Sequence, residues 1–196
     1  QFNVMGRFQV SNLMGVVHSL LFFGFEIEQI AHNIPKLTAP LGRMQSVKIQ
    51  NITVIIDYAH TPDALQNVLQ NIGGYKICVF GCGGNRDTSK RPIMGEISSE
   101  NADFVIITND NPRLENPKEI ASMIQKGIIK NNYEVILERK NAINKAIERG
   151  INMKNQNVSV VIAGKGNEDY QEMNGIKEHF SDLETVLEIA KSVQSI

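Results

Sequence analysis

Residues 52–84 read ITVIIDYAHTPDALQNVLQNIGGYKICVFGCGG, and this stretch decides the fold class of the 196-residue chain. It opens with a β-branched run at 52–57, continues with apolar residues at helical spacing over 61–72, and returns to an apolar run at 77–80. Pro62 stands where a first helical turn favours proline. A strand, a helix and a strand at this spacing predict a right-handed βαβ unit with parallel strands.

The same alternation continues to the end of the chain. Further strands are expected at 104–108, 133–137 and 158–163, and a short edge strand at His179-Phe180. These strands are nearly continuous apolar runs, which is typical of a parallel sheet covered on both faces. We therefore expect an α/β fold over residues 44–196, with a doubly wound, mostly parallel, Rossmann-like sheet.

The first 43 residues have a different pattern. Apolar spacing predicts a helix over 11–24, with Ser11 as its N-cap, and a second over 26–34 that ends before Pro35. Residues 35–43 contain two prolines and a glycine and are typical of a linker. We expect residues 1–43 to form a helical appendage that cannot be a domain alone.

Composition excludes several classes of protein. A hydrophobic content of 42% is enough for a packed core, and 20 Lys+Arg against 21 Asp+Glu gives a net charge of −1. A dedicated nucleic-acid binder needs an excess of basic residues, which this chain lacks. Its longest apolar run, at residues 20–25, is too short to span a membrane. Residues 1–10 do not resemble a signal peptide. Two cysteines fit a reducing compartment. We expect a cytoplasmic monomer that binds neither nucleic acid nor membrane and, because it opens with Gln1, a fragment of a longer protein.

Polar loops follow four of the predicted strands, at 57–62, 81–87, 109–113 and 164–169. Ligands of open α/β sheets bind beyond the carboxyl ends of the strands. The polar residues of any one loop could be explained by the needs of turns and helix caps alone. Because the four loops converge on one edge of the sheet, we predict a ligand site there.

Several features of these loops leave alternatives open. The glycines at 81–84 could bind an anion through backbone N–H groups at a helix start, although they lack a dinucleotide-binding spacing. Gly164-Lys165-Gly166 does not complete a phosphate-binding P-loop, so the phosphate cradle for any nucleotide hydrolysis lies outside this chain. His60, next to Asp57 at a strand end, could act in acid–base chemistry or only cap a helix. No catalytic residue other than His60 is suggested.

Cys78 and Cys82 are four residues apart, but a metal site needs two further ligands. No Cys/His pair follows at zinc spacing, so we expect core cysteines and no metal site in this chain.

Six motifs at these loops together resemble the Mur ligase family. They are Gly42-Arg43-Met44, 57–65, 79–87, 90–95, Asp110-Asn111-Pro112-Arg113 and 163–170. The resemblance implies that residues 1–43 are the end of a central ATPase domain plus linker, and that 44–196 form the C-terminal amino-acid-binding domain. It also implies ATP-dependent amide formation, with ATP and Mg²⁺ bound mainly by the part of the central domain that this chain lacks.

The reaction implied is the addition of meso-diaminopimelate to UDP-N-acetylmuramoyl-L-alanyl-D-glutamate in peptidoglycan synthesis. The residues implied for the nucleotide are Asn12, Arg43 and Asp57. Those implied for the amino acid are Arg86, Asp110, Asn111, Pro112, Arg113, Gly164 and Glu168. The chain departs from the family pattern at Gln9, where the family favours Asn, and at Asn167, where it usually has His.

Arg113 carries the expected preference for meso-diaminopimelate over lysine. The two amino acids differ by one carboxylate, and a guanidinium is a two-pronged donor for that group. Three alternatives remain: a lysine-adding ligase of the same type, a stand-alone amino-acid-binding module, and another amide ligase of the superfamily such as a folylpolyglutamate synthase. The Asp110-Asn111-Pro112-Arg113 loop speaks against the last of these by resemblance.

Overall fold

The computed structural model describes residues 7–37, 40–154 and 156–194 of the chain. The chain divides into two compact units, Gln1–Pro40 and Leu41–Ile196. Gly42 and Arg43 of the predicted linker lie in the second unit. Among the described residues, no helix combines the length and the apolar character needed to cross a bilayer.

The first unit is helical. It contains α1 (Arg7–Phe22), α2 (Ile27–Asn33) and a 3₁₀ turn, η1 (Ile34–Lys36). Because α1 already begins at Arg7, Ser11 lies inside the helix, and its predicted role as N-cap is wrong. Gly24 has a φ of 84°, a left-handed conformation that glycine adopts without strain, and the chain reverses there. The α-helical part of the second helix ends at Asn33, just before Pro35, as predicted.

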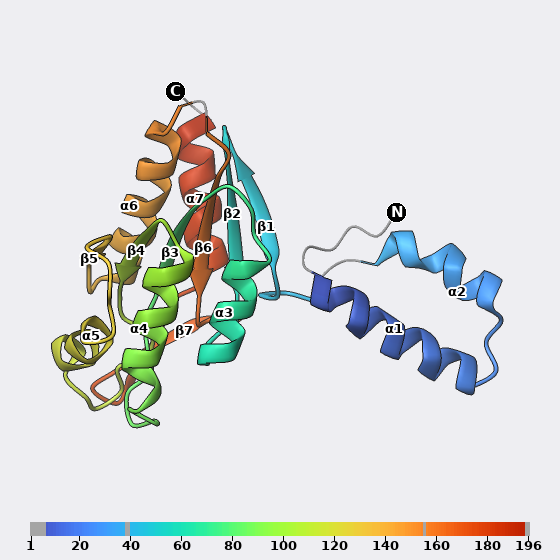
Figure 1. Ribbon diagram of the computed structural model, residues 1–196, viewed down its shortest axis with the longest axis horizontal. Helices are drawn as coiled ribbons and strands as arrows, with labels where there is room; N and C mark the ends of the chain where they lie inside the picture. The colour runs from blue at the N-terminus through green and yellow to red at the C-terminus, as the bar shows by residue number, and fades with distance from the viewer. Residues whose placement is uncertain (1–6, 38–39, 155, 195–196) are drawn as a thin grey trace. The chain divides into compact units, whose positions relative to one another are not determined.

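The second unit is built on a six-stranded sheet (Figure 1). Its strands are β1 (Gln45–Ile49), β2 (Ile52–Asp57), β3 (Tyr75–Phe80), β4 (Phe104–Ile107), β5 (Tyr133–Val135) and β6 (Val158–Ala163). Their order is β1-β2-β6-β3-β4-β5, and every neighbouring pair is parallel except β1 with β2. The predicted α/β fold with a mostly parallel sheet is confirmed.

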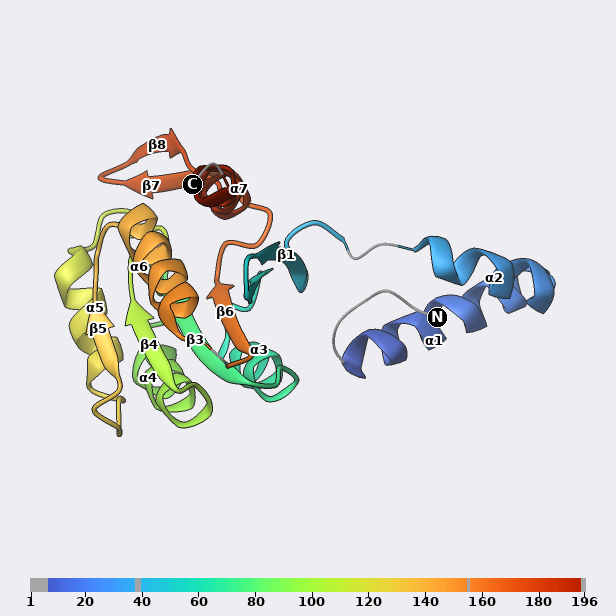
Figure 2. The same cartoon turned by 90° about the horizontal axis from the view of Figure 1, so that it is seen from above.

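Helices cover both faces of the sheet (Figures 1 and 2). They are α3 (Pro62–Gln70), α4 (Lys90–Asn101), α5 (Pro117–Gln125), α6 (Arg139–Asn152) and α7 (Asp182–Gln194). Helix α4 packs between α3 and α5, and α6 packs beside α7 against the opposite face. Ser181 caps the last helix, because its hydroxyl accepts a bond from the N–H of Glu184.

The main core lies between the sheet and the α6–α7 layer. Alternate residues of β1, β2, β3, β4 and β6 enter it, as in β6, where Val158, Val160 and Ile162 are fully buried. Helix α6 supplies the facing stripe at helical spacing, with Ala142, Ile143, Ala146 and Ile147. All six residues of β6 are buried, so both faces of this central strand are covered. Burial on both faces fixes the strand ends that carry the site.

Two strand pairs differ from the sequence-based expectation. β1 runs antiparallel to β2 and was not predicted. His179, expected in an edge strand of the main sheet, instead belongs to the separate hairpin of β7 (Tyr170–Met173) and β8 (Ile176–His179). Asn174 and Gly175 form its turn with φ values of 53° and 77°, the conformation that an Asn-Gly pair favours in two-residue hairpins.

Candidate functional site

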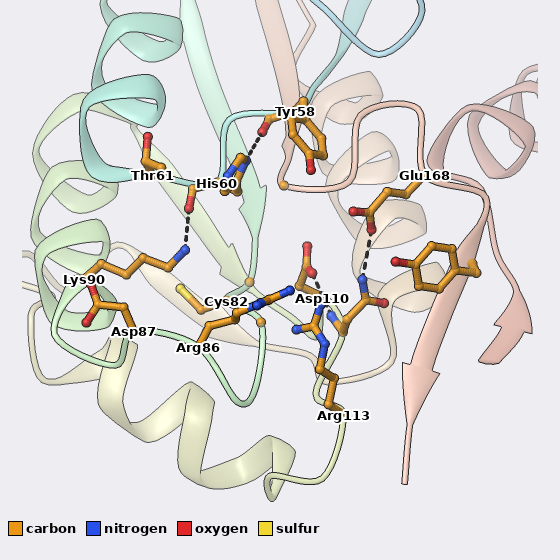
Figure 3. A pocket seen from close by; sticks show the side chains of 15 residues that line it. Tyr58, His60, Thr61, Cys82, Arg86, Asp87, Lys90, Asp110, Arg113 and Glu168 are labelled. Carbon is orange, nitrogen blue, oxygen red and sulfur yellow. Dashed lines mark hydrogen bonds between the residues drawn. The ribbon is translucent and has the colours of Figure 1, made fainter. Parts of the chain in front are cut away.

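A cavity of about 600 Å³ lies where the loops after β2, β3, β4 and β6 meet (Figure 3). It is lined by Tyr58, His60, Thr61, Gly81, Cys82, Gly83, Arg86, Asp87, Lys90, Asp110, Asn111, Arg113, Gly164, Glu168 and Tyr170. All four polar loops predicted from the sequence contribute to it. Six of the seven residues predicted to hold an amino acid line the cavity, and the seventh, Pro112, is buried behind it.

The glycines at 81–84 allow two backbone segments to approach closely. A Cβ at Gly81 would lie 2.1 Å from the carbonyl oxygen of Thr108, and one at Gly84 would lie 1.9 Å from that of Pro112. The N–H of Gly84 donates to the carbonyl oxygen of Asn111 at 2.9 Å. Helix α4 begins only at Lys90. The glycines are therefore not at a helix start, and that part of the anion-site alternative is wrong.

Asn111 and Glu168 lie side by side in the cavity lining. The amide nitrogen Nδ2 of Asn111 donates to Oε2 of Glu168 at 2.9 Å (Figure 3). Behind them lies Lys165, whose side chain is fully buried. Its Nζ donates to Oδ1 of Asn111 at 2.9 Å and lies 3.5 Å from Oε2 of Glu168. Burial lowers the pKa of Lys165, and the carboxylates of Asp110 and Glu168 oppose this effect.

The β7 strand holds Arg113. Its N–H donates to the carbonyl oxygen of Glu172 at 3.0 Å, and its Nε lies 3.7 Å from Oε2 of Glu172. One guanidinium nitrogen donates to the carbonyl oxygen of Gly84 at 2.8 Å. The backbone of Arg113 has a φ of 53°, an unfavourable conformation for a residue with a Cβ. Strain of this kind persists when surrounding contacts impose it, which is common at functional sites.

An ion pair between buried Arg91 and partly exposed Glu115 fastens the glycine loop to the loop after β4. Arg91 is fully buried, and its guanidinium donates to both carboxylate oxygens of Glu115 at 2.8 and 3.0 Å. It also donates to the carbonyl oxygen of Gly83 at 3.1 Å. The hydrogen bonds from Arg91 lower the pKa of Glu115. The backbone N–H of Asn85 donates to the same carboxylate.

A second ion pair, with both side chains fully buried, holds the ends of β4 and β6. Arg139 and Asp182 are both fully buried and share two bonds of 2.8 Å. The same guanidinium donates to the carbonyl oxygens of Asn109 at 3.1 Å and Ala163 at 3.0 Å. These two carbonyls stand where the loops that carry Asn111 and Glu168 begin. Sequence reasoning missed both ion pairs, because nothing local marks a buried arginine.

The residues predicted for the nucleotide have different surroundings. Asp57 is buried at the end of β2, where its carboxylate accepts bonds of 2.8 Å from the N–H groups of Met44 and Ala59. Burial raises its pKa, which these two bonds and nearby Arg43 partly offset. The guanidinium of Arg43 lies 4.8 Å from the centre of the Tyr58 ring. Asp57 and Arg43 are outside the cavity lining, which their neighbour Tyr58 joins.

Asn12 is exposed in the first unit, and its amide donates to the side chain of Gln9 at 3.2 Å. Gln9 is the residue that stands where the family favours Asn, and it thus supports the neighbouring Asn12.

His60 lines the cavity but does not pair with Asp57. Its Nδ1 is 2.8 Å from the carbonyl oxygen of Tyr58, and its ring packs edge-on against the Tyr58 ring. Its own carbonyl oxygen accepts a bond of 2.7 Å from Nζ of Lys90 (Figure 3). Thr61 caps α3 by accepting from the N–H of Ala64, so His60 itself is not the cap.

Both cysteines are buried, and burial raises the pKa of each thiol to about 12. The sulfur of Cys82 lies 3.8 Å from that of Met94. Thiols with so high a pKa are poor nucleophiles and metal ligands at neutral pH. Within residues 7–37, 40–154 and 156–194, no three His, Cys, Asp or Glu side chains form a group that could hold a metal ion.

The cavity combines both charges. Arg86, Lys90 and Arg113 supply cations, and Asp87, Asp110 and Glu168 supply carboxylates. A ligand that carries both a carboxylate and an ammonium group matches such a lining, because each charge finds a fixed partner.

Comparisons with known proteins agree with this geometry. The sequence pattern of the Mur ligase glutamate ligase domain matches residues 42–166. The UDP-N-acetylmuramoyl-L-alanyl-D-glutamate–2,6-diaminopimelate ligase 1 of Clostridium acetobutylicum is 42% identical over 198 residues, which cover 97% of this chain and 40% of that protein. The corresponding ligase of Aquifex aeolicus is 44% identical over 191 residues, or 95% of this chain and 39% of that protein.

Solved structures give the same result. A ligase of the same name superposes with a TM-score of 0.75 at 36% identity, covering all of this chain and 40% of that one. A Mycobacterium tuberculosis folylpolyglutamate synthase superposes with a TM-score of 0.66 at 19% identity, over 83% of this chain and 38% of that one, a likeness of fold alone. The chain thus spans about 40% of the length of these relatives. With a domain match over most of its length and relatives above 40% identity, the chain belongs to the Mur ligase family.

Proposed function

We propose that this chain is the C-terminal part of an ATP-dependent ligase that adds meso-diaminopimelate to UDP-N-acetylmuramoyl-L-alanyl-D-glutamate in peptidoglycan synthesis. The observation that carries the proposal is that Arg113 and Glu168 line the same cavity. In this proposal, residues 1–43 are the end of a central ATPase domain plus linker, and 44–196 are the amino-acid-binding domain. The relatives named for this reaction support the choice of substrate.

Meso-diaminopimelate carries a carboxylate and an ammonium group at each end. The guanidinium of Arg113 takes a carboxylate in a two-pronged contact, and Glu168 takes the adjacent ammonium. Arg86, Asn111 and the backbone of Gly164 hold the rest of the molecule. Asp110 and Pro112 fix the loop that carries Arg113. Lysine lacks the carboxylate at its far end and would leave Arg113 without a partner, so it is rejected.

The chemistry needs positioning more than a protein nucleophile. ATP phosphorylates the glutamate carboxylate of the acceptor to an acyl phosphate, the amine attacks the carbonyl carbon, and phosphate leaves with the bonding electrons. The cavity contributes by holding the amine in line with that carbon and by excluding water. His60, at the cavity wall, is the candidate for accepting the proton that the amine loses.

In this proposal, the nucleotide is bound with the help of Asn12, Arg43 and Asp57. The part of the chain that the structure describes offers no metal-binding cluster. By the family resemblance, we place the Mg²⁺ that accompanies ATP, and the cradle for its phosphates, mainly in the part of the central ATPase domain that this chain lacks. The enzyme would work as a cytoplasmic monomer.

A ligation assay tests the proposal. The longer protein that contains this chain is incubated with ATP, Mg²⁺, UDP-N-acetylmuramoyl-L-alanyl-D-glutamate and one amino acid at a time, and phosphate release is measured together with the tripeptide product. We expect both to depend on meso-diaminopimelate. Equal activity with lysine would identify a lysine-adding ligase. Binding of meso-diaminopimelate in calorimetry without any phosphate release would identify a binding module.

A further inference from the structure

Lys165 is a buried cation next to the cavity that does not itself line it. Its Nζ has two acceptors at hydrogen-bond distance, Oδ1 of Asn111 at 2.9 Å and the carbonyl oxygen of Tyr170 at 2.6 Å. The aromatic ring of Tyr170 covers it, with Nζ 5.5 Å from the ring centre. Lys165 therefore cannot reach a ligand directly, and any influence it has passes through its neighbours.

The amide oxygen of Asn111 is saturated by donors from the protein. Besides Lys165, the backbone N–H of Glu172 on β7 donates to Oδ1 at 3.0 Å. A carbonyl oxygen has two lone pairs, so both are occupied. The Nδ2 group is thereby forced to the other side, where it meets Glu168 at 2.9 Å. The two donors decide which end of the amide faces the cavity.

We propose that Lys165 is a positioning residue that fixes the amide orientation of Asn111, so that Asn111 and Glu168 present one donor and one acceptor side by side to the ligand. This inference rests on the proposed function only in naming the ligand as an amino acid. An amino-acid centre has a carboxylate and an ammonium on one carbon, and it needs this pair of neighbours. Without Lys165, Asn111 could rotate its oxygen toward Glu168, and two acceptors would then face each other.

The charge of Lys165 also helps to position Glu168. Its Nζ is 3.5 Å from Oε2 of Glu168, so the ammonium group attracts the Glu168 carboxylate toward Asn111. The bond to the carbonyl oxygen of Tyr170 ties Lys165 to the first residue of β7, the strand that also holds Arg113. One buried side chain thus connects the loops after β4 and β6 with the hairpin.

The kinetic test is a double-mutant cycle in the longer protein with Lys165→Met and Asn111→Ala. Lys165→Met should raise the KM for meso-diaminopimelate roughly ten- to a hundredfold, the usual range for leaving a polar group unpaired, while the KM for ATP and kcat change little. In the Asn111→Ala background, the same substitution should change that KM by less than about threefold. Lys177→Met is the matched control, because Lys177 also lies over the Tyr170 ring, at 4.5 Å, but on the exposed strand β8. An equal effect of Lys165→Met in both backgrounds, or no effect, would overturn the inference.

A second measurement does not depend on ligation. In the 196-residue chain, the side-chain NH₂ protons of Asn111 should exchange with water more slowly than those of exposed Asn152, measured by NMR. In Lys165→Met, the exchange of Asn111 should approach that of Asn152. Fast exchange of Asn111 in the unmodified chain refutes the inference even where the variant does not fold. If the unmodified longer protein ligates no amino acid, the proposed function fails and the NMR result alone decides the role of Lys165.

Discussion

Three cations, Arg91, Arg139 and Lys165, have fully buried side chains, and each is bonded to backbone carbonyls near the cavity. A buried charge is tolerated only when it is paired and hydrogen-bonded. The bonds that satisfy these three cations come from segments 5 to 54 residues away in the chain. At the scale of single residues, the requirement to satisfy buried charge therefore fixes the loops that surround the ligand.

Sequence reasoning could place the residues that line the cavity but not those that support them. Arg113 and Glu168 follow strands whose apolar runs are plain, so their convergence was predictable. Arg139 opens a helix that reads as amphipathic and solvated, and nothing local indicates that Asp182 will meet it 43 positions later. Lys165 was visible in the motif, but its role depends on Glu172 and Tyr170 in a hairpin that was not predicted.

Replacing Glu115 by Gln should reduce stability by about 1–3 kcal/mol, because buried Arg91 loses a charged partner. Arg91 lowers the pKa of Glu115 below its ordinary value of 4.5 in the folded protein. The stability that this pair contributes is therefore complete above pH 4.5 and is lost as the pH falls through the lower, folded-state pKa. Chemical denaturation between pH 3 and pH 7 should show that the free energy of unfolding falls less on acidification in Glu115→Gln than in the unmodified chain. Glu96→Gln, on the exposed side of α4, is the control, and a parallel curve for Glu115→Gln would contradict the assignment.

Replacing Asp57 by Ala should affect both stability and nucleotide use. The N–H groups of Met44 and Ala59 lose their acceptor in a buried place, at about 1–3 kcal/mol for each group. In the longer protein, the apparent KM for ATP should rise while the KM for meso-diaminopimelate changes little, since Asp57 is outside the cavity lining. Steady-state kinetics with each substrate varied in turn will separate the two. An unchanged KM for ATP would show that Asp57 is only structural.

At the scale of elements, the strands missed by sequence reasoning are those without a buried apolar run. β1 alternates between exposed and half-buried residues over most of its length, and β8 is exposed throughout. The strands β2, β3, β4 and β6 were recognisable because their residues are mostly buried between the two helix layers. The edge strand β5 is only half-buried, and it was recognisable from the largely apolar sequence at 133–137. The hairpin did leave one local signal, the Asn174-Gly175 pair, whose preference for a tight turn is independent of burial.

The hairpin turn is predicted to matter for amino-acid binding. Gly175→Ala places a Cβ at a φ of 77° and should cost about 1–2 kcal/mol. Because the backbone of Arg113 is bonded to Glu172 and Asn174, a loosened hairpin should also raise the KM for meso-diaminopimelate and leave that for ATP unchanged. Thermal unfolding and kinetics will check both effects. Gly73→Ala is the control, since Gly73 has an ordinary φ and open space where a Cβ would lie. Equal changes in stability and in KM for the two variants would contradict the predicted role of the hairpin turn.

At the scale of the whole molecule, the chain carries the proposed amino-acid site but no P-loop sequence. We predict that residues 1–196 alone do not hydrolyse ATP, because the phosphates and their metal ion need groups that this sequence does not supply. Purified chain, ATP and Mg²⁺ in a phosphate-release assay provide the test, with the longer protein as the positive control. Magnesium-dependent release of phosphate by the 196-residue chain, at a rate comparable to that of the longer protein, would contradict this prediction.

The measurement that tests the central claim most directly is the ratio of kcat/KM for meso-diaminopimelate to that for lysine, compared between the unmodified longer protein and its Arg113→Ala and Arg113→Lys variants. Each ratio compares two amino acids on the same protein, so differences in folding cancel. Losing the guanidinium should cost about 2–5 kcal/mol with meso-diaminopimelate and much less with lysine, so the ratio should collapse in Arg113→Ala. Arg113→Lys should recover only part of it, because an ammonium cannot make the two-pronged contact. A strong preference for meso-diaminopimelate that survives in Arg113→Ala, or efficient use of lysine by the unmodified protein, would contradict the account.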